Sequence, residues 1–401
     1  MTDTNRVNVA YVKETTYGVT PSGPPTLKDL RFVSESVAQE NTTVTSQEIR
    51  SDRQVSALLR TGIRAPGDLN FEFSYGAFDE WLEWSLLSNA TWTTPVTIGP
   101  GPSFVVTVPG GVYTITRGTG SFITDGLSAT TSVGQWAELR GFVNTGNNGY
   151  FKIASVSATV ITFTGGTGTP SAEGANTSAS IVQGAQITNG VALSTFALEK
   201  NFQDAVSGHQ FEINNGMAID RLRLEIPVDN IVTGTFGLLG KKSASASATA
   251  GTGTNTASAQ NQVDTGVDNA LAILEGPAYT AQGTVSANFE LQNNLRTRQQ
   301  LGTLGPVSLG TGTVNVTGQH RAYYTDKGII DKANNQTVSA LAYVLEQSAG
   351  SNAVVFDFPS IKYSAGKRVT PGINQDVIAD MTWTAFRNAT EGITSRIVRF
   401  V

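Results

Sequence analysis

Hydrophobic and polar residues alternate along several short segments of the chain. At residues 69–75 every second side chain is Leu, Phe, Phe or Tyr, with Asn, Glu and Ser between them. Residues 221–226 and 314–317 repeat this period of two. Because consecutive side chains of a strand point to opposite faces of a sheet, the pattern predicts strands with one buried face. One helix is predicted at residues 78–87, where apolar side chains recur with the spacing of a single helical face.

Composition changes abruptly between residues 93 and 190. This stretch of 98 residues holds only six charged side chains but seventeen glycines. Short apolar runs such as 159–163 are separated by Gly-rich turns, a pattern typical of a small all-β domain. A second uncharged stretch, 243–262, consists entirely of Ser, Ala, Thr, Gly, Asn and Gln, and we interpret it as a flexible linker.

Two parts of the chain resemble each other. Gly-Asp-Leu-Asn-Phe at 67–71 is echoed by Gly-Thr-Val-Asn-Val at 312–316, 245 positions later. Phe-Glu-Ile at 211–213 is echoed by Phe-Asp-Phe at 356–358, only 145 positions later. The offset falls by 100 positions, which matches the length of the charge-poor stretch. We therefore interpret the chain as a duplicated module with an insertion in its first copy.

The fold class that follows is mainly β. We expect two tandem β-sandwich modules with short flanking helices, plus an inserted small all-β domain, immunoglobulin-like or similar. The expected boundaries are 1–92 and 191–242 for the first module, 93–190 for the inserted domain, 243–262 for the linker and 263–401 for the second module.

Composition also narrows the possible chemistry. Charged residues make up 15% of the chain, below the roughly 25% of ordinary globular proteins, and the formal net charge is −5. There is no cysteine, and the two histidines are His209 and His320, so thiol catalysis, Cys-based metal sites and catalytic triads have few or no residues available. Residues 237–243 resemble a phosphate-binding loop but lack its spacing. We expect no enzymatic activity, no cofactor and no metal.

Arginine-rich segments are the most informative polar feature. One lies at residues 48–60 between two strand signals, and another occupies the matching place in the second copy. Long loops of mixed charge are either disordered or ordered by a partner, and arginine favours interface contacts. The predicted subunit or ring contacts are Glu48, Arg50, Asp52, Arg53, Arg60, Arg296 and Arg298.

Several longer segments resemble the tail tube proteins of phages with long non-contractile tails. These are YVKETTYGVTP (11–21), LRFVSES (30–36), TSQEIRSDRQV (45–55), GDLNFEFSYGAFDEWLE (67–83), NNLRTRQQLGTLGP (293–306) and NQDVIADMTWTAFRNAT (374–390). GSFITDG (120–126) and GNNGYFKIASV (146–156) resemble an inserted β domain found in one branch of that family.

The resemblance implies a structural virion protein whose rings stack into a hollow tube for genome delivery. Two modules per chain would close a pseudo-sixfold ring with three subunits, whereas one module per chain would need a hexamer. The implied partners are further copies of the chain, the tape-measure protein, tail tip or terminator proteins, and genomic DNA in transit. Assembly would take place in the host bacterial cytoplasm, and no membrane partner is expected.

An acidic lumen would repel the DNA backbone and let it slide. The candidate lining residues are Glu35, Glu40, Glu72 and Glu290. We further expect residues 41–60 to be mobile in a free subunit and the inserted domain to project outward as decoration. The alternatives are a cell-surface or fibre adhesin, which would usually carry a secretion signal or long repeats, and a polysaccharide-degrading enzyme, which needs a carboxylate pair in an aromatic cleft.

Overall fold

A computed structural model describes residues 3–205, 208–325, 327–347, 352–370 and 372–401 of the chain. Within these residues most regular structure is β-strand, accompanied by two short α-helices and three 3-10 turns. The mainly β fold predicted from the alternating pattern is confirmed. The 3-10 turns are η1 (Thr4–Arg6), η2 (Pro109–Gly111) and η3 (Thr145–Asn147).

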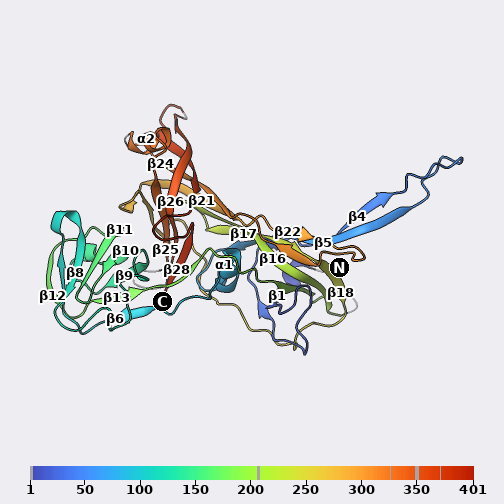
Figure 1. Cartoon of the computed structure of the whole chain (residues 1–401), viewed down its shortest axis with the longest axis horizontal. Helices are drawn as coiled ribbons and strands as arrows, with labels where there is room; N and C mark the ends of the chain where they lie inside the picture. Colours follow the sequence, from blue (N-terminus) through green and yellow to red (C-terminus); the bar gives the residue numbers. More distant parts are fainter. Residues whose placement is uncertain (1–2, 206–207, 326, 348–351, 371) are drawn as a thin grey trace.

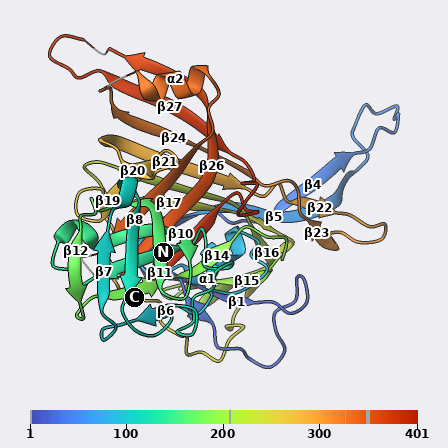
Figure 2. The ribbon, with the colours of Figure 1, turned by 60° about the vertical axis from the view of Figure 1, so that its left-hand side comes forward.

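Eight strands form a continuous antiparallel sheet, here called the inner sheet. Its order is β3-β5-β17-β16-β21-β24-β27-β26, and Figure 2 shows several of these strands side by side. Their bounds are β3 (Ser34–Glu35), β5 (Leu58–Glu72), β17 (Thr233–Gly240), β16 (Gln210–Pro227), β21 (Thr284–Gln292), β24 (Asn315–Tyr323), β27 (Ile378–Ala385) and β26 (Ala353–Val369).

The first halves of β16 and β26 leave the inner sheet and join two outer sheets. The first outer sheet has the order β2-β1-β15-β16-β18, and the second has the order β20-β19-β25-β26-β28-β14. The bounds are β1 (Val7–Lys13), β2 (Lys28–Asp29), β14 (Ala185–Thr188), β15 (Phe196–Phe202), β18 (Lys242–Ala246), β19 (Ala270–Glu275), β20 (Thr280–Ala281), β25 (Ser339–Glu346) and β28 (Arg396–Phe400).

The two halves of the chain thus repeat one topology. In each half a long strand passes from the outer to the inner sheet, and its pairing register shifts soon after it enters the inner sheet. The shift lies between Ile219 and Arg221 in β16 and between Tyr363 and Ala365 in β26. An extra residue of this kind lets a strand bend sharply. A helix occupies the same place in both halves: α1 (Asp79–Ser85) follows β5, and α2 (Gly328–Asn334) follows β24.

The main core lies between the inner sheet, the outer sheets and the two helices. Trp81 of α1 packs on Phe196 and Phe236, with ring centroids 4.9 and 5.1 Å apart. The predicted helix is confirmed, although α1 ends earlier than residue 87. Leu87 adopts a positive φ of 47°, which is incompatible with a further helical turn.

A separate eight-stranded sheet has the order β12-β7-β8-β11-β10-β9-β13-β6 and its own apolar core. In Figure 1 it lies at one end of the molecule, beside β25 and β28. We call it the β6–β13 domain. Its strands are β6 (Val96–Ile98), β7 (Phe104–Thr107), β8 (Tyr113–Arg117), β9 (Trp136–Arg140), β10 (Gly149–Val156), β11 (Val160–Gly166), β12 (Glu173–Asn176) and β13 (Ser180–Gln183).

Residues 243–262 differ from the flexible linker that their composition predicted. They begin in β18, which pairs with β16, and then follow the first outer sheet. Glu199 accepts hydrogen bonds from the Thr249 hydroxyl (2.7 Å) and the Ala250 amide (2.6 Å). The Thr256 carbonyl accepts one from the amide of Asp29 (2.9 Å). We call residues 247–262 the strap, because these hydrogen bonds hold the segment against the sheet.

Candidate functional site

The inner sheet has one apolar and one polar face. Alternate residues of its strands, such as Phe71, Phe236, Leu224, Phe289 and Trp383, are buried in the main core. The residues between them point the other way and are partly or fully exposed. This alternation follows from the period of two in a strand, and it gives both modules one shared polar surface.

Cross-strand registers arrange the polar face in rows. Two rows are Asn70–Thr235–Arg223–Glu290–Thr317–Thr384–Lys362 and Glu72–Thr233–Glu225–Asn288–Gln319–Thr382. Side chains directly opposite each other in an antiparallel pair lie close enough to interact. Both rows cross from the first half of the chain to the second at the β16–β21 pair.

Charges of both signs lie on this face. Arg223 pairs with Glu225 at 2.5 Å, Arg221 with Asp68 at 2.9 Å, and Lys367 lies 3.8 Å from Asp380. These pairs are substantially exposed, so each contributes little to stability. They do neutralise much of the negative charge locally, which makes the face mixed rather than uniformly acidic.

The structure separates the four predicted lining glutamates. Glu72 and Glu290 lie on the polar face. Glu35 lies opposite Leu69 on the core side and pairs with buried Lys200 at 2.7 Å, so we withdraw it from the lining candidates. Glu40 begins β4 (Glu40–Thr45), outside the inner sheet, and pairs with Arg64 at 2.7 Å.

A long hairpin, here called the arm, carries most of the predicted contact residues. It comprises β4, the first part of β5 and the turn between them, and Figure 1 shows it extending away from the body. Glu48, Arg50, Asp52 and Arg53 lie in its turn, and Arg60 lies on β5. Several apolar side chains of the arm are exposed, including Ile49, which is 99% accessible, and Val44, Val55, Leu58 and Leu59.

Within the arm turn, Arg50 donates to Asp52 at 2.9 Å. This hydrogen bond lowers the pKa of the Asp52 carboxyl below its usual value. Arg296 and Arg298 lie on a second hairpin formed by β22 (Arg296–Arg298) and β23 (Ser308–Gly310). The two hairpins meet where the Ile63 amide donates to the Leu304 carbonyl at 3.1 Å. The predicted contact residues therefore lie on two adjacent hairpins, with the arm turn farthest from the body.

A family model described as phage tail tube protein matches residues 4–385. The chain belongs to this family. No curated protein matches the sequence significantly. Membership makes the chain a structural protein of the phage virion that assembles with itself into a tube, and it favours the tube over the adhesin alternative. Among the described residues, neither helix has the length or the hydrophobicity of a membrane-spanning segment.

Only glutamates were predicted to line the lumen of this tail tube protein. The arginines that give the polar face its mixed charge were not predicted to lie beside them. Arg221, Arg223 and Glu225 were visible in the sequence as the polar half of an alternating strand. The ion pair of Arg221 with Asp68 and the position of Arg223 opposite Glu290 were not, because they depend on which distant strands become neighbours.

Proposed function

We propose that this tail tube protein forms trimeric, pseudo-sixfold rings whose stacking makes the conduit for genome delivery, with the polar face of the inner sheet lining the lumen. The repeated topology carries the proposal. It supports two ring-forming modules at 1–92 with 191–242 and at 263–401, and an inserted domain at 93–190. Three chains then supply six modules, and six chains remain the alternative.

The edges of the inner sheet indicate how the ring would close. Inside one chain, the second half of β16 pairs with β21 and so joins the first module to the second. Within the described residues, the corresponding part of β26 pairs with β27 on one edge and with no strand on the other. At the opposite end of the sheet, β3 pairs with β5 and, among the strands that the structure describes, with no other. Closing these two edges against each other removes the unpaired strands.

Aligning the two register shifts gives the expected pairing. Lys367 then corresponds to Arg223, which lies opposite Glu290. In the second module, the cross-strand partners lead from β26 through β27 and β24 to Glu290 in β21. In the first module, the same path from β16 through β17 and β5 leads to Ala38, which is therefore the counterpart of Glu290. We therefore expect Lys367 of one subunit to lie opposite Ala38 of the next.

Cysteine cross-linking tests this closure, because the native chain has no cysteine to interfere. A chain carrying Ala38→Cys and Lys367→Cys should form, on mild oxidation of assembled tubes, a covalent ladder that ends at three subunits. The control Arg223→Cys with Glu290→Cys should link within one chain and form no ladder. A ladder ending at six supports the hexamer. Intact tubes without any cross-link contradict the proposed closure while leaving tube formation standing.

The polar face would let DNA slide because two of its arginines are already ion-paired with carboxylates of the same face. Glu72, Glu225 and Glu290 provide carboxylates facing the phosphates, and Glu40 joins them if β4 approaches the next subunit's β26. Arginines on the same face moderate their repulsion. Glu72→Lys with Glu290→Lys should slow genome ejection from assembled phage, whereas unchanged ejection kinetics would remove this role.

The arm is proposed to contact the adjacent ring. Its exposed apolar side chains and arginines suit burial against another subunit. Tape-measure, tip and terminator proteins would meet the same lumen and ring ends. Protease cleavage within residues 46–57 should be rapid in free subunits and at least about tenfold slower in tubes, since a buried segment must open before it is cut. Equal cleavage in both states would contradict the ring contact.

A further inference from the structure

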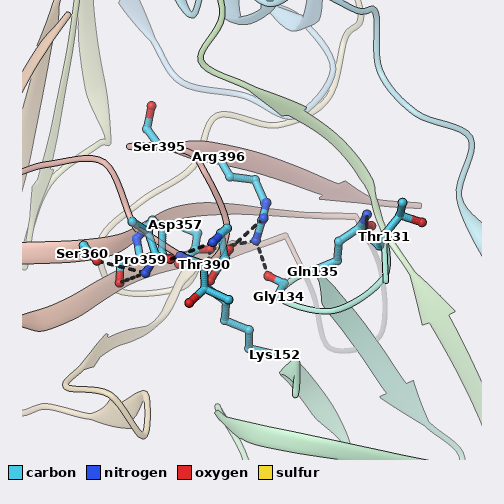
Figure 3. A network of polar contacts seen from close by, with 12 residues as sticks. Thr131, Gly134, Gln135, Lys152, Asp357, Pro359, Ser360, Thr390, Ser395 and Arg396 are labelled. Atoms are coloured by element: carbon cyan, nitrogen blue, oxygen red, sulfur yellow. Dashed lines mark hydrogen bonds and ion pairs between the residues drawn. The ribbon is translucent and has the colours of Figure 1, made fainter. Parts of the chain in front are cut away.

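A buried polar cluster joins the β6–β13 domain to the second module. Lys152 comes from β10, Asp357 from β26 and Arg396 from the start of β28 (Figure 3). Glu391 comes from the segment before β28. The side chains of Lys152, Asp357 and Arg396 are 4%, 0% and 5% exposed, and that of Glu391 is 14% exposed. Tyr279 completes the cluster.

The lysine amine lies directly against a carboxyl group. Lys152 Nζ is 2.9 Å from Asp357 Oδ2 and 2.9 Å from Glu391 Oε1. Its third neighbour is the Tyr279 hydroxyl, at 2.8 Å. Holding an amine at such a distance from a carboxyl group makes their reaction effectively unimolecular.

Other donors surround the same carboxyl group. The Tyr279 hydroxyl donates to Asp357 Oδ1 at 2.9 Å, and Arg396 Nη1 lies 3.2 Å from Asp357 Oδ2. Burial and the adjacent carboxylates raise the pKa of Tyr279 well above its ordinary value, so its hydroxyl stays protonated as a donor. Fixed donors at both oxygens would stabilise the negative charge that develops when a nucleophile attacks the carboxyl carbon.

The surroundings of the cluster are apolar. Trp136, Tyr150, Leu274, Val355 and Val398 belong to one buried hydrophobic group at this boundary. Two cations and two anions are therefore held where charge is costly. Uniting Lys152 with Asp357 would remove one charge of each sign and leave Arg396 paired with Glu391, whose Oε2 lies 2.8 Å from Arg396 Nη2.

We propose that Lys152 and Asp357 condense to an isopeptide bond. Lys152 Nζ first gives a proton to Glu391, and the neutral amine attacks Cγ of Asp357. Tyr279 and Arg396 stabilise the tetrahedral oxyanion. A C–O bond of Asp357 then breaks as Nζ gives up a second proton and Glu391 returns the first, so that the oxygen leaves as water. An ammonium and a carboxylate become an amide and water, and no other reactant is needed.

Such a bond would tie residues 152 and 357, far apart in sequence, across the boundary between the β6–β13 domain and β26. It would make the domain a covalent part of the second module. Because the site is buried, hydrolysis of the amide would be suppressed.

Intact-mass measurement of the denatured full-length protein, followed by peptide mapping, tests the proposal. Wild type should be lighter than its sequence by one water molecule, with Lys152 and Asp357 in one branched peptide. Lys152→Arg should have its full sequence mass, and Glu391→Gln should form the bond at least about a hundredfold more slowly, as loss of a general base predicts. The control Lys332→Arg, at another lysine–glutamate pair, should leave the link unchanged.

Wild-type protein of full sequence mass, with the two peptides recovered separately, would overturn the proposal. Loss of water mapped to any other residues would overturn it as well. If Lys152→Arg does not fold, the wild-type peptide map alone still decides between a covalent bond and an ion-paired cluster.

Discussion

The two outer sheets occupy equivalent places in the repeated topology, yet their outward faces are covered in different ways. The second outer sheet presents an apolar face, and the β6–β13 domain packs Trp136 and Tyr150 against it. The first outer sheet carries buried Glu199 at the equivalent place, and the strap binds that carboxylate through Thr249 and Ala250. One face is covered by a domain with its own core, and the other by a short irregular segment.

This difference explains why the chain has two charge-poor stretches. A segment of small polar residues can hydrogen-bond a carboxylate but buries little apolar area, so it suits the first face. An apolar sheet face needs a partner with large side chains, and such a partner needs a core of its own. We therefore infer that both stretches act as covers, and that the β6–β13 domain braces the second module.

Removing the β6–β13 domain should have the largest effect. Val96 lies opposite Gln183 where β6 pairs with β13, so a short Gly/Ser linker can join these two residues in place of the domain between them. Deletion would expose the apolar face and leave Asp357 and Arg396 without Lys152, at a cost of roughly 3–5 kcal/mol or more for the broken buried pair. We expect aggregation and no tubes by negative-stain microscopy. Normal tubes from the shortened chain would show that the domain is dispensable.

Trp136→Ala tests the same contact with a single change. Trp136 is fully buried and lies edge-on to Tyr279, with ring centroids 5.3 Å apart. The expected loss is about 3–5 kcal/mol of unfolding free energy in denaturant titration. Val143→Ala, at a position of the same domain that is 81% exposed, is the matched control and should change stability by about 0.5 kcal/mol or less. Equal small losses for both variants would argue against a brace.

Acid should weaken the second module selectively. Burial lowers the pKa of His320, in β24, to about 4, whereas an unfolded histidine titrates near 6.5. The unfolded state therefore takes up this proton first as the pH falls, and the contribution of His320 to stability decreases between about pH 6.5 and 4. The full loss is on the order of 3 kcal/mol. In urea titrations at pH 7 and pH 4, His320→Gln should show a smaller decrease than wild type, and an identical decrease would assign the effect to other groups.

Glu199→Ala should have the smallest of these effects. It removes the carboxylate that binds the strap and leaves the Ala250 amide without this acceptor, which costs about 1–3 kcal/mol. Hydrogen exchange should rise at residues 249–251 while the second module stays protected. If the amides of the second module exchanged faster to the same extent, the two covers would not be independent.

The sequence was sufficient for the strands and the helix near Trp81, because these depend on local periodicity. It was insufficient where distant strands meet. The position of Arg223 opposite Glu290, the core-facing position of Glu35 and the contact of Lys152 with Asp357 each depend on tertiary neighbours. The strap was predicted to be a flexible linker because small polar residues are typical of linkers. Its hydrogen bond to Glu199 shows that the segment is held in place.

Cryo-electron microscopy of purified tubes tests the central claim most directly. We predict three chains in each ring, with Glu72, Arg223 and Glu290 of the polar face toward the lumen. The free edge of β26 should pair with the segment around Ala38 of the next chain, and the β6–β13 domain should lie on the outside. A map in which the polar face points outward, or in which that edge of β26 remains unpaired within the ring, would contradict it.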